Sequence, residues 1–147
     1  MIYSHSVHVP LPPERAIHLF TPVGERLWVT HWEPRFPAGE EGDGSAPGTV
    51  FLTGDTHWVV VDRTPDRVRY ARVTPGIRAG TVEVAVRPDG ERADRERTDR
   101  EGADREGAIA DVTYAMTSFA GDDEYDPAIH EWEPAIAAAI ARDHARR

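Results

Sequence analysis

Cysteine and lysine are both absent from this sequence of 147 residues. Without cysteine the chain has no disulfide, thiolate nucleophile or cysteine-ligated metal centre, and a reducing compartment suits it. All 17 of its basic residues are therefore arginine, and against 26 acidic residues they leave a formal net charge of −9. This acidic balance argues against nucleic acid and anionic membrane surfaces as partners, because both attract a basic face.

Long apolar runs are missing as well. No stretch approaches the roughly 18 apolar residues that a membrane-spanning helix needs. Residues 1–16 lack the basic region and apolar run of a secretory signal. We therefore expect a cytoplasmic protein with no integral membrane segment. The hydrophobic content of 39% is sufficient for one domain with its own core.

Seven segments carry the β-branched and aromatic residues typical of strands, and proline or glycine turn signals separate most of them. The clearest is 80–88, where Val82, Val84 and Val86 alternate with other residues and predict one buried and one solvent-exposed face. The seven expected strands are 2–9, 27–34, 49–54, 56–64, 66–74, 80–88 and 108–120.

Two helical regions accompany these strands. After the first strand, Pro13 suits a first helical turn, residues 16–20 supply an apolar face, and a second short turn is expected over 22–27. Pro134 either kinks the C-terminal helix or marks its true start, with 123–133 as a separate turn. Apolar residues at spacings of three and four form one stripe along this helix: Tyr125, Ile129, Trp132, Ile136 and Ile140.

A tandem repeat of five residues, ADRER-TDREG-ADREG, occupies 93–107 within the charged stretch 89–107. Its only apolar side chains are two alanines. It cannot bury surface, so we expect a solvated loop inserted between two strands of a single domain that spans 1–147. Because loops tolerate insertions, we expect no function in this repeat.

The expected order is one strand, two short helices, six strands and one long helix, an α+β arrangement in which the helix covers one face of the sheet. With this order the chain resembles the SRPBCC superfamily, which includes START lipid-transfer domains, birch-pollen-type allergens and polyketide cyclase-like proteins. The segments EGDGSAPGTVFL (41–52) and YARVTPGIRAGTVEV (70–84) are similar to the glycine-rich hairpin of the allergens and to bacterial members. The resemblance implies a helix-grip fold, in which a curved seven-stranded antiparallel sheet wraps around the C-terminal helix.

The resemblance also implies a hydrophobic cavity between the sheet and the long helix, with the large side chains of this sequence as its walls. Taken alone, the same side chains fit a filled core equally well. The superfamily has no universal catalytic residues, so none is transferred. The expected ligand-binding residues are Trp28, Trp32, Phe51, Trp58, Tyr70, Arg72, Val84, Tyr114, Met116, Ile129, Trp132 and Ile136.

Arg72 is the first of three candidates for a catalytic role. It shares strand parity with Val68 and Tyr70, which places a cation inside the apolar cavity. There it would receive a ligand carboxylate or polarise a carbonyl. Two alternatives remain: an ion pair with Glu83 on the next strand, or a register change that turns Arg72 outward.

His31 and His57 are the other two candidates, each within a Thr-His-Trp sequence. A histidine in an apolar cleft is a possible general base. The alternative, which we favour, is a rim histidine with one hydrogen bond, because no third orienting group is evident. His5 and His8 fall on opposite faces of a strand, so we expect no metal site, and no cofactor is expected either.

Three functions follow from this reading. The first, which we favour, is binding of a small hydrophobic molecule, lipid-like or aromatic and polyketide-like, held by burial. The second is an enzyme of the cyclase or dehydratase type acting in the same cavity. The third is an interaction module, as in co-chaperone relatives, which requires a filled interior and a large exposed patch. We expect a monomer or a homodimer.

Overall fold

The computed structural model describes residues 1–90, 107–119 and 126–145. The tandem repeat, predicted to be a solvated loop, falls outside these residues except for its last glycine. The described elements are β1 (Ile2–Val9), α1 (Pro13–Ala16), η1 (Ile17–Phe20), η2 (Gly24–Leu27), β2 (Val50–Thr53), β3 (Thr56–Thr64), β4 (Arg67–Thr74), β5 (Arg78–Pro88), β6 (Ala108–Ser118), η4 (Ile129–Glu131) and α3 (Trp132–Ala145).

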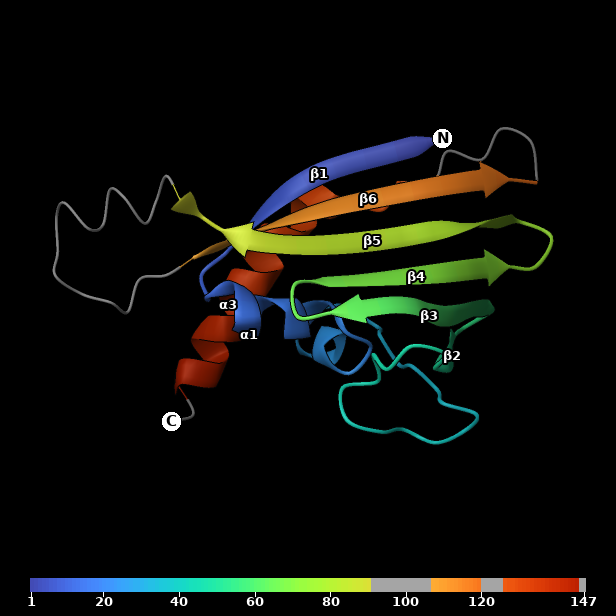
Figure 1. The fold of residues 1–147 in the computed structure, drawn as a ribbon, viewed down its shortest axis with the longest axis horizontal. Helices are drawn as coiled ribbons and strands as arrows, with labels where there is room; N and C mark the ends of the chain where they lie inside the picture. The colour runs from blue at the N-terminus through green and yellow to red at the C-terminus, as the bar shows by residue number, and fades with distance from the viewer. Residues whose placement is uncertain (91–106, 120–125, 146–147) are drawn as a thin grey trace, which may run out of the picture.

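The strands form one antiparallel sheet in the order β1-β6-β5-β4-β3-β2 (Figure 1). β1 returns beside β6, so the first and last strands of the chain are neighbours. The short helices and α3 lie on one side of the sheet, which gives an α+β fold of two layers. None of the described helices has the length and apolar character needed to cross a lipid bilayer.

The sheet has six strands where seven were predicted, and the difference lies in 27–34. This segment leaves η2 through turns, and His31 has φ 60°, a left-handed conformation that strands do not contain. The indole N–H groups of Trp28 and Trp32 donate to the carbonyl oxygens of Leu19 in η1 and of Pro22 in the turn after it, both at 2.7 Å. The strand prediction was wrong because β-propensity does not report such tertiary bonds, which here hold the segment as a loop.

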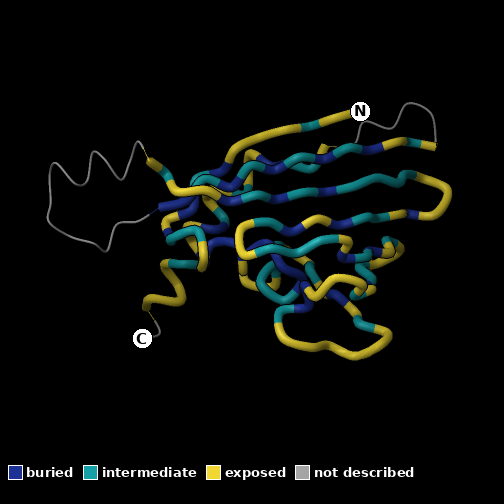
Figure 2. The backbone as a smooth tube through the Cα atoms, viewed as in Figure 1, coloured by how far each residue is buried: buried dark blue, intermediate teal, exposed yellow. Residues whose placement is uncertain are grey.

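The core lies on the inner face of the sheet, where side chains of alternate parity are buried. On β5 these are Val82, Val84 and Val86, as the alternation predicted, and β6 continues the face with Val112 and Tyr114. Figure 2 shows these buried positions interleaved with less buried ones along both strands. Period-2 alternation therefore positions every inward side chain, including those that reach the cavity described below.

The turn after α1 and η1 is held by Thr21, which is fully buried. Its hydroxyl donates to the His18 carbonyl oxygen at 2.7 Å and accepts the Gly24 backbone N–H at 3.0 Å. The Thr21 carbonyl oxygen in turn accepts the Glu25 N–H at 2.9 Å. These bonds satisfy backbone donors at the start of η2, as a helix cap does. They also fix the backbone position of Glu25.

A second clamp joins the loop 38–48 to the same turn. The Val23 N–H donates to the Asp43 carbonyl oxygen at 3.1 Å. The Asp43 carboxylate accepts the Ser45 hydroxyl at 2.5 Å and lies 3.0 Å from the His18 ring nitrogen. Burial acts to raise the pKa of Asp43, but these hydrogen bonds outweigh it and hold the pKa below the ordinary 3.8.

The C-terminal helix begins later than the apolar stripe suggested. A single turn, η4, precedes α3, and Pro134 lies in the first turn of α3, where the missing N–H costs no helical bond. Of the two alternatives for Pro134, the one in which a separate turn precedes the helix is confirmed. Ile129 and Ile136 of the predicted stripe are buried and Ile140 is half-buried, whereas Tyr125 lies outside the described residues.

Candidate functional site

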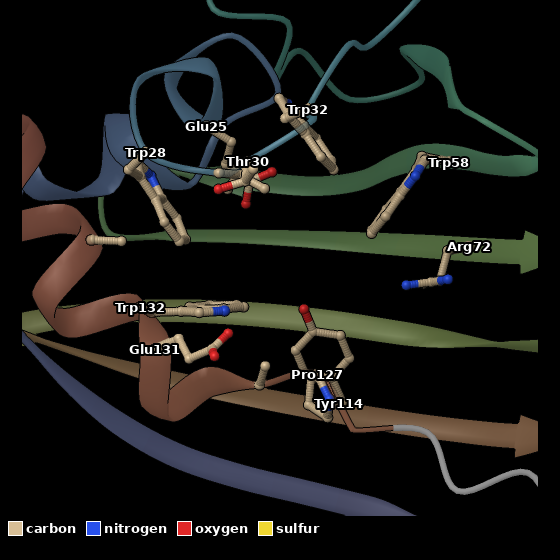
Figure 3. Close-up of a pocket in the computed structure, with 13 residues that line it drawn as sticks. Glu25, Trp28, Thr30, Trp32, Trp58, Arg72, Tyr114, Pro127, Glu131 and Trp132 are labelled. Atoms are coloured by element: carbon tan, nitrogen blue, oxygen red, sulfur yellow. The ribbon is translucent and has the colours of Figure 1, made fainter.

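A cavity of about 350 Å³ lies between the inner face of the sheet, the N-terminal part of α3 and the segment that follows η2 (Figure 3). We call it the tryptophan cavity, because all four tryptophans of the chain line it. The complete lining is Glu25, Trp28, Val29, Thr30, Trp32, Trp58, Arg72, Tyr114, Pro127, Ala128, Glu131, Trp132 and Ala135.

Three of the four indole rings are fixed by hydrogen bonds from their N–H groups to neighbouring residues. Trp28 and Trp32 donate to carbonyl oxygens of Leu19 and Pro22, and Trp58 donates to the Thr53 hydroxyl at 2.9 Å. Since these N–H groups already donate hydrogen bonds within the protein, the rings present mainly their apolar faces and edges to the cavity. The walls are therefore apolar and preorganised.

The rings also pack against one another, which fixes the shape of the space between them. The centroids of Trp28 and Trp132 lie 5.2 Å apart and those of Trp32 and Trp58 lie 5.9 Å apart, both as edge-to-face pairs. Edge-to-face packing is the arrangement that aromatic quadrupoles prefer. The two pairs leave the cavity open, so the filled-core alternative does not describe this part of the interior.

Arg72 projects from the inner face of β4 into the cavity, on the side that strand parity predicted. Its guanidinium carbon lies 4.8 Å from the centroid of the Trp58 ring, and its Nη2 donates to the Thr74 hydroxyl at 3.3 Å. The predicted alternative of a pair with Glu83 is not observed, because Glu83 lies opposite Arg69 in the register and 3.5 Å from the Arg67 Nε. A half-buried cation thus forms one wall of the cavity.

Glu25 is the second ionisable group of the lining, and sequence analysis did not identify it. It lies on η2, where the Thr21 and Asp43 clamps hold the backbone. Burial raises the pKa of the Glu25 carboxyl well above its ordinary value of 4.5, since a carboxylate is poorly solvated there. The group therefore resists ionisation and can donate a hydrogen bond as a neutral acid.

This raised pKa predicts a pH-dependent stability that Glu25→Gln removes. The Glu25 carboxyl binds its proton more tightly in the folded protein than in the unfolded chain. Its ionisation therefore does not destabilise the fold below pH 4.5, and the destabilisation grows as the pH rises towards the raised pKa. We expect the unfolding free energy of Glu25→Gln to increase relative to that of the wild type as the pH rises over this range, by up to about 1.4 kcal/mol per pH unit.

Urea unfolding at several pH values between about 4 and 8 measures this difference. The matched control is Glu33→Gln, an exposed glutamate eight positions further along the same segment, which should track the wild type at every pH. If the unfolding free energies of the wild type and Glu25→Gln changed with pH in parallel, the claim that burial raises the pKa of this carboxyl would be contradicted.

The predicted binding residues separate into a lining set and a supporting set. Trp28, Trp32, Trp58, Arg72, Tyr114 and Trp132 line the cavity. The others are buried beneath it, because strand parity shows that a side chain points inward but not how deep it lies. This supporting set is Phe51, Tyr70, Val84, Met116, Ile129 and Ile136.

Two members of the supporting set show why they do not reach the cavity. The Phe51 ring stacks on Trp58 with an interplanar angle of 6° and is 1% exposed, so Trp58 stands between it and the cavity. The Tyr70 hydroxyl is already used, because it donates to the Phe20 carbonyl oxygen at 2.6 Å. Burial raises the pKa of Tyr70 well above 10.0, so this tyrosine is a structural donor.

The two candidate histidines do not line the cavity. His31 is exposed on the loop after η2, and His57 is exposed on the outer face of β3, with Leu52 and Val73 as its cross-strand neighbours. The general-base role, which was the less favoured alternative, needs a histidine in the cleft; His57 instead has the opposite parity to Trp58, and His31 lies on a loop. In the described parts of the chain, no three His, Asp or Glu side chains gather closely enough to hold a metal ion.

No protein-family model matches this sequence, and no curated protein matches it either. Solved structures do match. A protein from Nitrosospira multiformis is 14% identical, with full coverage of both chains and a TM-score of 0.65. CalU16 from Micromonospora echinospora is 14% identical over 98% of this chain and 70% of its own, with a TM-score of 0.53. Ara h 8.0201 is 10% identical over 96% and 98%, with a TM-score of 0.52.

At these identities the comparisons establish the fold alone. The chain has the α+β fold of the birch-pollen-allergen type, an antiparallel sheet with a C-terminal helix. That part of the expected fold is confirmed, with six strands in place of seven. The functional argument that follows is based on the residues that line the cavity in this chain.

Proposed function

We propose that this chain is a member of the SRPBCC superfamily and binds a small, largely aromatic molecule in the tryptophan cavity. One observation carries the proposal: about 350 Å³ stays open between four tryptophans, three of which are held by indole hydrogen bonds to Leu19, Pro22 and Thr53. Binding pockets for small molecules commonly have volumes of about 300–1,000 Å³, mostly apolar walls and a few placed polar groups. The tryptophan cavity has each of these features.

The walls favour a planar aromatic ligand over an aliphatic one. Aromatic rings pack edge-to-face or offset against indole rings and gain about 0.5–1.5 kcal/mol per pair beyond the burial of area. At about 30 Å³ per water molecule in the liquid, the cavity corresponds to about a dozen waters, which is the size of a one- or two-ring molecule. Burial at about 25 cal/mol per Å², less the cost of association, gives affinities in the micromolar range.

A ligand screen tests this proposal with two independent readouts. Because every tryptophan lines the cavity, a bound molecule should change the intrinsic fluorescence as well as the melting temperature. An aromatic ligand at about 100 times its Kd stabilises the fold by about 2.7 kcal/mol, a shift of several degrees. The panel holds one- and two-ring aromatic acids and phenols, fatty acids, and cyclohexane analogues as aliphatic controls.

We expect aromatic members to raise the melting temperature and alter the fluorescence together, and their cyclohexane analogues to do so less. A panel in which no compound produces either change would overturn the binding proposal. A cytoplasmic location and a monomeric or homodimeric state are further proposals from the sequence.

Glu25 supports a second candidate, an enzyme of the cyclase or dehydratase type. A protonated carboxyl in a cavity donates a proton to a substrate carbonyl oxygen, while Arg72 stabilises the enolate of the attacking carbon. Glu131, the other carboxyl group of the lining, would accept the proton that this carbon loses. The screen distinguishes the two: a carrier returns its ligand unchanged in mass and retention time, whereas an enzyme converts it and loses conversion in Glu25→Gln.

The interaction-module alternative has less support. It requires a filled interior and a large exposed patch, and the charged insertion at 89–107 is the only segment of the sequence that offers one. The cavity is open, and all of the repeat but its last glycine lies outside the described residues. We therefore propose ligand binding first and turnover second.

A further inference from the structure

Two carboxyl groups accompany one of the two indole pairs in the tryptophan cavity. Glu25 lies on η2, which ends directly before Trp28. Glu131 is the last residue of η4, directly before Trp132. The centroids of these two rings lie 5.2 Å apart, so the ring contact brings both turns to the same part of the cavity. Both glutamates line the cavity, and Figure 3 shows them on the side where this ring pair lies. One part of the lining is therefore both aromatic and acidic.

Neither of these carboxyl groups takes part in a hydrogen bond or an ion pair within residues 1–90, 107–119 and 126–145. Asp43 provides the contrast, because its half-buried carboxylate accepts the Ser45 hydroxyl and lies 3.0 Å from a ring nitrogen of His18. Acidic groups withdrawn from water are stabilised by such partners. The cavity therefore offers two acidic groups whose partner a ligand can supply.

The indole rings supply a second attraction, for a positive charge. Of the aromatic side chains, tryptophan attracts a cation to its face most strongly. The cavity contains one example from the chain itself, because the Arg72 guanidinium carbon lies 4.8 Å from the centroid of the Trp58 ring. This arginine also donates to the Thr74 hydroxyl and accompanies the other ring pair. Among the described residues that line the cavity, no cation accompanies Trp28 and Trp132.

A protonated amino group satisfies both attractions at once. Its N–H groups donate charge-assisted hydrogen bonds to carboxylates, which are roughly twice as strong as neutral hydrogen bonds. Its positive charge is attracted by the faces of the indole rings. A phenol offers a donor without the charge, and a carboxylate is repelled by a like charge. The acidic and aromatic part of the lining therefore favours an amine over both.

We propose that the ligand of the tryptophan cavity is an aromatic amine whose protonated amino group is held by Glu25 and Glu131. The Trp28–Trp132 pair contacts this group, and the ring system of the ligand occupies the rest of the cavity. This inference rests on the proposed binding function and narrows it to one chemical class of ligand. It needs no free charge on Arg72, because the amino group lies with the other ring pair.

Isothermal titration calorimetry with three matched probes tests the inference: 2-naphthylmethylamine, 2-naphthylmethanol and 2-naphthoate. The ring system is constant, and the substituent changes from a cation to a neutral donor to an anion at about pH 7.5, where an alkylamine is protonated. We expect the amine to bind at least about tenfold more tightly than the alcohol, because the alcohol lacks the charge. The carboxylate should bind no more tightly than the alcohol.

The variant Glu131→Gln should reduce the advantage of the amine over the alcohol, and the double variant Glu25→Gln, Glu131→Gln should remove it. Both substitutions keep the size of the side chain and remove its charge. The matched control is Glu33→Gln, an exposed glutamate outside the cavity lining, which should preserve the advantage. If the double variant does not fold, Glu131→Gln still decides together with the wild type, since Glu131 is exposed and its substitution leaves the core unchanged.

The outcomes separate this inference from the proposed function. Equal affinities for the three probes, or tightest binding of the carboxylate, would overturn the amine and leave the binding of aromatic molecules standing. An unchanged preference for the amine in Glu131→Gln and in the double variant would place the amino group elsewhere and overturn this site. No binding of any probe, together with a negative screen of the wider panel, would overturn both proposals.

Discussion

Ala135→Phe is expected to abolish ligand binding without unfolding the protein. Ala135 lies on α3 and lines the tryptophan cavity, where it is half-buried. A phenyl ring on this residue occupies the space that the ligand needs and leaves too little room for a second ring system. We expect a loss of at least about 100-fold in affinity, the equivalent of about 2.7 kcal/mol, measured by calorimetry with the tightest ligand of the screen.

The matched control is Ala138→Phe, three residues further along the same helix. Ala138 is exposed, so the same substitution adds the same side chain and the same change in helix propensity outside the cavity. Its affinity should equal that of the wild type. Both variants should melt within a few degrees of the wild type, because one ring enters an open space and the other enters solvent. Retained binding in Ala135→Phe would show that the ligand binds elsewhere.

Phe20→Ala is expected to cause the largest loss of stability, about 3–5 kcal/mol. The Phe20 side chain is fully buried at the end of η1. Its ring centroid lies 5.8 Å from that of Trp28 and 6.3 Å from that of Trp132. Removing the ring opens a void beneath two walls of the cavity, so we expect a lower urea midpoint, together with weaker ligand binding in the fraction that remains folded.

Phe119→Ala provides the comparison for this variant, since the Phe119 side chain is 60% exposed at the end of β6. Its unfolding free energy should remain within about 0.5 kcal/mol of the wild type. A loss below about 1 kcal/mol for Phe20→Ala would mean that the surrounding rings collapse into the void. In that case Phe20 would not be the support that fixes Trp28 and Trp132.

The sheet could be predicted from the sequence wherever one face of a strand is buried. The segments 2–9 and 56–64 were predicted with the bounds that the structure has, because turn residues punctuate a pattern with period two. The segment 27–34 has the composition of a strand, but its tryptophans bond to a neighbouring turn. That information is tertiary and leaves no periodic signal in the chain.

The cavity could be predicted only in part, for a related reason. Parity placed Arg72 on the inner face, and the family resemblance placed Trp58 and Tyr114 among the walls of the cavity, where all three are found. Neither argument could separate these residues from Phe51, which lies behind Trp58 on the same face of the sheet. Depth within the core depends on how the helix crosses the sheet, and the sequence pattern of either element alone does not contain it.

Glu25 shows what sequence reasoning missed at the site itself. A single glutamate in a short turn is typical of a solvated surface, and the surrounding sequence VGERLWV gives no sign of burial. Its position depends on the hydroxyl of Thr21 and on the loop that carries Asp43. The only available signal was its place two residues before the Leu27-Trp28 pair, in a segment otherwise rich in apolar residues.

The most direct test of this account is a crystal structure of the protein grown with the tightest-binding aromatic compound of the panel. We predict electron density for a flat molecule in the tryptophan cavity between α3 and the sheet. A cavity closed by the tryptophan and tyrosine rings, with the compound bound on the outer surface or absent, would contradict the claim that this interior is a binding site.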